Sequence, residues 1–149
     1  MAVRVFALFT IAALTVASPA VARDAAPYGD FTECGDANSI ASLRGTECAR
    51  IEAPLNHSEP DEGTVELFVR KFPVEGAPKG QLWLVAGGPG ESGAPFYPFI
   101  DTVRTAAPGF DLLVPDHRGT GFSTRLCPEE ESTSSDGGSA LAGKEWGTC

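Results

Sequence analysis

The sequence has little positive charge, few histidines and no long apolar run, and each shortage argues against a class of protein. Its 149 residues carry 11 Lys and Arg against 20 Asp and Glu, which gives a formal net charge of −9. Because no excess of cations is present to neutralise phosphates, the composition argues against nucleic-acid binding and against docking on anionic membranes. Two histidines and the lack of a C-x-x-C pair argue against a zinc site. We therefore expect no metal and no cofactor.

The longest apolar run lies at the N-terminus and is too short to span a membrane. Residues 5–16 are almost continuously apolar, about a dozen residues where a span needs about 20. Ala20-Val21-Ala22 has the small-x-small pattern of a cleavage site. We interpret 1–22 as a secretory signal peptide. This interpretation predicts a secreted or periplasmic protein with no membrane attachment after cleavage.

Export changes the interpretation of the four cysteines, because oxidising compartments favour disulfides over metal sites. The cysteines are Cys34, Cys48, Cys127 and Cys149. Three pairings are possible, and the local one, Cys34–Cys48 with Cys127–Cys149, closes the shortest loops. We expect this local pairing, with one reduced pair or an unpaired Cys149 as the alternatives.

The mature sequence predicts two antiparallel strands followed by a strand–helix–strand unit. The expected elements are strands at 47–55, 64–72, 81–85 and 110–115 and a helix at 95–106, in which Phe96, Phe99, Ile100 and Val103 form the apolar face. We expect 23–45 to be an extended N-terminal arm, 46–127 to be the folded part, and 128–149 to be a low-complexity loop. A strand–helix–strand unit places its two strands in parallel, so the turns that follow them meet at one edge of the sheet.

Both turns at this edge are rich in glycine. The first contains a literal G-x-G-x-x-G at Gly88, Gly90 and Gly93, and Asp116 follows at the end of the next strand. This pattern is that of a dinucleotide-binding fingerprint. Pro89 argues against that interpretation, because it removes a backbone N–H where phosphate oxygens need donors. An exported protein also meets little dinucleotide.

A second interpretation of the first turn is an oxyanion loop. Consecutive glycines let the backbone approach a ligand closely, and the Gly88 N–H is placed to stabilise a developing oxyanion, an effect of roughly 3–4 kcal/mol per donor. A plain strand-to-helix turn fits the spacing equally well. The residues alone leave both alternatives open.

The two turns taken together carry a resemblance to a known family. Gly87-Gly88-Pro89-Gly90-Glu91-Ser92-Gly93, followed by Asp116-His117-Arg118-Gly119-Thr120-Gly121-Phe122-Ser123, resembles the α/β-hydrolase family of secreted tripeptidyl aminopeptidases and proline iminopeptidases. The resemblance extends over about residues 34–127. It implies an α/β fold class: the N-terminal part of an α/β-hydrolase fold, in which an antiparallel hairpin leads into a parallel β-α-β unit of an incomplete sheet. It also implies a Ser-His-Asp triad and a peptide substrate.

The resemblance assigns roles to individual residues of both turns. It implies an oxyanion loop of Gly87, Gly88, Pro89 and Gly90, and a supporting turn of Asp116, Arg118, Gly119, Gly121 and Ser123. Ala86 departs from the pattern, because many relatives have His before the two glycines.

The triad itself is missing from these 149 residues. None of the serines lies in a G-x-S-x-G elbow, which is where the family places its nucleophile, and the family's acid and histidine come later in the chain. We therefore expect an N-terminal fragment of a secreted serine hydrolase, inactive by itself. The alternatives are an exported non-catalytic binding module, an esterase of the same fold, or a dinucleotide-binding protein.

Overall fold

The structure is a computed structural model, and it describes residues 29–88, 90–136 and 141–149. The expected signal peptide at 1–22 and Pro89 of the first glycine turn lie outside the described residues, as do 23–28 of the expected arm and 137–140 of the C-terminal loop. Within the described part of the chain, no helix is both long and apolar enough to cross a membrane.

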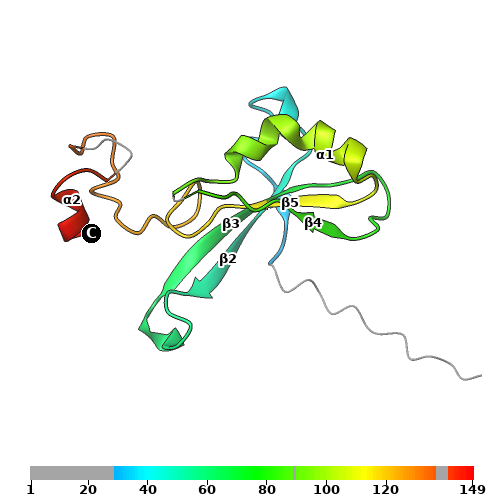
Figure 1. The fold of residues 1–149 in the computed structure, drawn as a ribbon. Coiled ribbons are helices and arrows are strands. Elements are labelled where there is room, and N and C mark those ends of the chain that lie inside the picture. Colours follow the sequence, from blue (N-terminus) through cyan, green and yellow to red (C-terminus); the bar gives the residue numbers. More distant parts are fainter. Residues whose placement is uncertain (1–28, 89, 137–140) are drawn as a thin grey trace, which may run out of the picture.

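The described residues form an open, mixed sheet of five strands in the order β1-β2-β3-β5-β4 (Figure 1). The strands are β1 (Thr32–Glu33), β2 (Glu47–Pro54), β3 (Thr64–Phe72), β4 (Gln81–Trp83) and β5 (Asp111–Pro115). The helices are α1 (Ile100–Ala106) and α2 (Glu145–Thr148), with 3-10 turns η1 (Ala41–Leu43), η2 (Pro60–Glu62) and η3 (Ala94–Phe99). This architecture is compatible with part of an α/β fold.

β2 and β3 form the expected antiparallel hairpin. They pair from Glu47↔Lys71 to Pro54↔Thr64, which joins the two strands over their full overlap. The Val- and Phe-rich sequence of β3 suits a strand with both faces covered, because β-branched and aromatic side chains pack well on a pleated surface. Residues 56–63 make the turn, with η2 beginning at Pro60.

β4 and β5 are parallel neighbours, as the strand–helix–strand pattern predicts. The connecting helix differs from the expectation: η3 occupies its first half, and the α-helix begins only at Ile100. Pro98 explains this difference, because proline has no N–H to donate and its ring clashes with the preceding turn of an α-helix. The tighter turn also moves Phe99 off the predicted apolar face, so that its side chain is 60% exposed.

The two faces of the sheet are covered differently. Figure 1 shows α1 lying across one face, where the buried cluster is Leu43, Phe72, Ile100, Leu112 and Val114. On the opposite face a largely apolar hollow of about 360 Å³ is lined by β-strand residues that include Ile51, Leu67 and Trp83. In the described part of the sheet, β4 is an edge strand, because β5 is its one partner.

The described residues of the expected arm are folded against the sheet instead of extended from it. β1 adds to the edge of β2 through Thr32↔Cys48 and Glu33↔Glu47. The following loop buries Ala37 and Leu43, and Leu43 joins the cluster beneath α1. The low share of strong helix and strand formers in 29–45 explains why the sequence pattern did not predict this packing.

Both disulfides have the local pairing. Cys34–Cys48 joins residues 14 apart in sequence and Cys127–Cys149 joins residues 22 apart, with Cα–Cα distances of 5.0 and 5.5 Å. In the described residues of 128–149, turns lead to the short helix α2. Figure 1 shows this C-terminal segment to one side of the sheet.

Candidate functional site

The candidate site lies where β4 and β5 end. Because the two strands are parallel and in register, with Trp83 beside Leu113, the turns that follow them lie at the same edge of the sheet. The first turn runs from Gly87 to Gly93, and the second runs from Asp116 to Ser123.

One buried carboxylate joins these two turns. Asp116 is 3% exposed. Its Oδ1 accepts a hydrogen bond from the Gly93 N–H at 2.8 Å, and its Oδ2 accepts one from the Phe122 N–H at 2.8 Å. A hydrogen bond from a backbone N–H to a carboxylate is stronger than one to a neutral acceptor. Asp116 therefore fixes the end of the first turn against the second.

Glycine is required at both ends of this connection. A Cβ on Gly121, whose φ is +54°, would overlap the Asp116 carboxylate. A Cβ on Gly93 would overlap Val114 and come within 2.9 Å of the Pro115 carbonyl oxygen. The two glycines let the chain pass close to the carboxylate from either side.

Ser123 connects the second turn to the middle of β3. Its hydroxyl accepts a hydrogen bond from the Phe68 N–H at 2.8 Å and donates one to the Asp116 carbonyl at 2.9 Å. The Asp116 N–H in turn donates to the Phe68 carbonyl at 2.9 Å. Hydrogen bonds to Phe68 of β3 thus hold both ends of the second turn, Asp116 and Ser123, against the sheet.

Two further residues of the expected supporting turn, Arg118 and Gly119, contact residues outside it. Arg118 donates a hydrogen bond to the Leu55 carbonyl at 2.7 Å, which links the turn to the end of the hairpin. Gly119 has a φ of +79° and lies beneath the Leu126 side chain. The supporting role of this turn stays a prediction, although its residues are well placed for it.

The first turn is more exposed than the second and makes fewer contacts with the rest of the protein. Gly87, Gly88 and Gly90 are exposed, and a Cβ at Gly87 or Gly90 would meet no atom within 4 Å. Gly88 has a φ of +91°, and its carbonyl accepts a hydrogen bond from the Glu91 N–H. Among the described residues, none accepts a hydrogen bond from the Gly88 N–H. A donor left free on an open glycine loop can bind an oxyanion.

Two further contacts near this turn join residues that lie far apart in the sequence. The His117 ring hydrogen-bonds the Ala86 carbonyl through Nε2 at 2.9 Å, which ties the second turn to the residue before Gly87. Tyr97 lies in η3, just after the first turn, with Arg70 5.1 Å above its ring. Burial raises the pKa of Tyr97 above its usual 10.0, and the Arg70 guanidinium opposes this increase. Sequence patterns carry no signal for contacts between residues this far apart.

The geometry disfavours a dinucleotide site. That interpretation needs the Asp116 carboxylate to bind a ribose hydroxyl, but both of its oxygens accept backbone N–H groups within the protein. The Gly93 N–H donates to this carboxylate and is therefore not available to a phosphate. Nor does the described part of the chain contain a group of three or more His, Cys, Asp or Glu placed to hold a metal ion.

Comparison with known proteins points to hydrolases. No family model matches the chain. Proline iminopeptidase aneH of Aspergillus aculeatus is 40% identical over 81 residues, which cover 52% of this chain and 18% of that protein. Serine protease Hip1 of Mycobacterium tuberculosis is 31% identical over 97 residues, or 63% of this chain and 19% of that protein, and Hip1 of Mycobacterium bovis matches equally.

The chain thus spans less than one fifth of the length of these curated relatives. Two differently named groups of hydrolases match it, and their names support a hydrolase family and a peptidase-like function. The two disulfides and the similarity to Hip1 are compatible with an extracellular location.

Proposed function

We propose that this chain forms the N-terminal part of a secreted serine hydrolase of the α/β-hydrolase type, an aminopeptidase that removes N-terminal peptides or proline. The observation that carries the proposal is the pair of glycine turns joined through Asp116 at the ends of two parallel strands. This arrangement keeps an exposed glycine loop beside a rigid turn.

In the intact enzyme, the Gly88 N–H donates one of the hydrogen bonds that stabilise the tetrahedral oxyanion. Gly87 and Gly90 shape the loop around it. A serine outside these 149 residues attacks the substrate carbonyl with a histidine as its base. Asp116, Arg118, Gly119, Gly121 and Ser123 hold the loop in place and take no part in the chemistry.

The open edge of β4 is consistent with this proposal. An edge strand can add a further strand along its outer side. Val85, just beyond the edge strand, is 55% exposed. A larger sheet would cover both features.

A fluorophosphonate probe tests the proposal, because it labels only an activated serine. We expect the purified 149-residue chain to stay unlabelled and to release no product from alanyl or prolyl p-nitroanilides. We expect antibodies against residues 29–149 to recover a larger, labelled protein from the producing organism. Recovery of an unlabelled, monomeric protein with the mass of residues 23–149 would instead support the exported binding module.

A further inference from the structure

A fully buried arginine lies in the middle of the sheet. Arg70 of β3 is 1% exposed. An isolated buried cation is strongly unfavourable, because the protein interior cannot replace its hydration. Its charge must therefore be neutralised by a partner within the fold.

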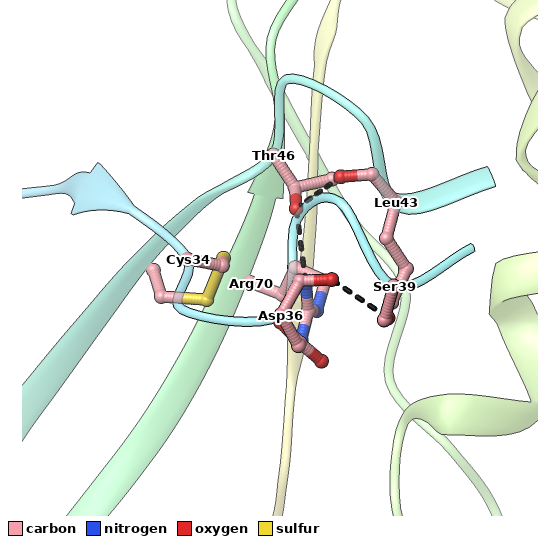
Figure 2. The surroundings of a disulfide bond; sticks show 7 residues. Cys34, Asp36, Ser39, Leu43, Thr46 and Arg70 are labelled. Atoms are coloured by element: carbon pink, nitrogen blue, oxygen red, sulfur yellow. Dashed lines mark hydrogen bonds and ion pairs between the residues drawn. A yellow bond between two sulfur atoms is a disulfide. The ribbon is translucent and has the colours of Figure 1, made fainter. Parts of the chain in front are cut away.

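The carboxylate that pairs with Arg70 and the hydroxyl of Thr46 both come from one loop, residues 35–47, while the neutral Tyr97 side chain of η3 also contacts the guanidinium. The Asp36 carboxylate accepts hydrogen bonds from Nη2 at 2.8 Å with each of its oxygens, and Thr46 Oγ1 accepts one from Nη1 at 2.9 Å. Figure 2 shows Asp36 and Thr46 next to the Arg70 guanidinium. Arg70 Nε is buried with no hydrogen-bond partner among the described residues, and Asp36 is the one carboxylate paired with the guanidinium there.

The Cys34–Cys48 disulfide closes this same loop. Cys48 lies directly opposite Arg70 in the β2–β3 pairing, so the two side chains share a face of the sheet. Figure 2 shows the disulfide beside the guanidinium. Between the two cysteines the loop has two glycines and one short 3-10 turn, η1, and turn hydrogen bonds and the buried Leu43 hold it together with the disulfide. Asp36 is also 38% exposed, so water competes for it once the loop is released.

We propose that the Cys34–Cys48 disulfide makes folding conditional on an oxidising environment, because it holds in place the carboxylate that neutralises Arg70. On oxidation the two thiols lose two electrons and two protons to an exchanging disulfide, which leaves as two thiols. In the reduced chain the loop gains freedom, the Asp36 carboxylate is released, and Arg70 loses the one ion pair that it makes among the described residues. The fold is then stable after export and unstable in a reducing cytosol.

The test is a double-mutant cycle between the disulfide and the charge. Fractions unfolded are measured by pulse proteolysis in urea, at low protein concentration, on the 149-residue chain and on the chain carrying Arg70→Met. Cys34→Ser with Cys48→Ser removes the disulfide in each. We expect this removal to raise the unfolding equilibrium constant by about tenfold or more beyond its effect in the Arg70→Met chain. Equal effects in the two chains would overturn the proposal.

The second disulfide is the matched control. Chain entropy alone gives the longer loop of Cys127–Cys149 a roughly twofold greater effect on the unfolding constant than Cys34–Cys48. Cys127→Ser with Cys149→Ser should have the same effect with and without Arg70. If its effect depends on Arg70 as strongly as that of Cys34–Cys48 does, the coupling is not specific and the proposal fails.

Asp36→Asn keeps the test decisive if the chain without the disulfide does not fold. This variant retains the cross-link and the side-chain shape but removes the counter-charge. We expect it to raise the unfolding constant about tenfold or more with Arg70 present and to have little effect in the Arg70→Met chain. A similar cost in both chains would show that Asp36 does not act through Arg70.

Discussion

The two glycine turns lie side by side, yet the protein uses their backbones in opposite ways. In the second turn, Asp116 and Ser123 are buried and hydrogen-bonded to β3 and to both turns. In the first, Gly87, Gly88 and Gly90 are exposed, and space is open around two of them. The comparison teaches that glycine can serve two purposes in neighbouring turns: close packing around a buried carboxylate, and an open, exposed backbone.

The largest effect should come from removing the carboxylate that joins the turns. Asp116→Ala leaves the N–H groups of Gly93 and Phe122 without their acceptor, at about 1–3 kcal/mol for each buried donor. We expect the free energy of unfolding to fall by about 4 kcal/mol, measured by urea denaturation. Asp61→Ala, an exposed aspartate in η2, is the control and should change it by less than about 0.5 kcal/mol. Equal losses would mean that the carboxylate does not hold the turns.

A smaller effect should separate two glycines of the same turn. Gly93→Ala forces a methyl group against Val114 and the Pro115 carbonyl, and overpacking of this kind costs about 1–3 kcal/mol. Gly87→Ala meets no atom within 4 Å and should cost less than about 0.5 kcal/mol. Thermal unfolding of the two variants measures the difference. A larger loss at Gly87 than at Gly93 would reverse our assignment of the packed and open ends.

The smallest effect concerns Tyr97, the aromatic residue that follows the first turn. Burial raises its pKa above 10.0, and the charges of Asp116 and Asp36 raise it further. The folded state therefore holds the phenolic proton more tightly than the unfolded state does. This contribution to stability is complete below pH 10 and is lost as the pH rises through the folded-state pKa.

Tyr97→Phe isolates this contribution. We expect the native chain to lose more stability than the Tyr97→Phe chain as the pH rises above about 10, and to match its pH dependence below that pH. Urea denaturation at each pH measures both. Parallel curves throughout would show that Tyr97 is not buried enough to resist ionisation.

The sequence predicted those parts of the fold that depend on local pattern. The bounds of β3 and the parallel pairing of β4 with β5 followed from apolar runs separated by glycine and proline. The prediction of a helix at 95–106 was correct only for its second half, because Pro98 converts the first half to a 3-10 turn. The local disulfide pairing also followed from the spacing of the cysteines.

The contacts that connect distant residues could not be predicted. A lone arginine among the apolar residues of a strand is ordinarily expected to face solvent, yet Arg70 is buried because Asp36, 34 residues earlier, folds back onto it. The roles of Asp116 and Ser123 came from family resemblance, but their hydrogen bonds to Gly93 and Phe68 depend on tertiary structure. Periodicity and spacing describe single elements and carry no information on such pairs.

The position of Asp116 also constrains how this region can evolve. Gly93 and Gly121 come from different turns, but a side chain at either would press on the carboxylate or on the strand end that bears it. A substitution tolerated at one glycine would therefore depend on what occupies the other. Gly93 and Gly121 must therefore change together, whereas Gly87, which has open space around it and no left-handed φ, is free of this constraint.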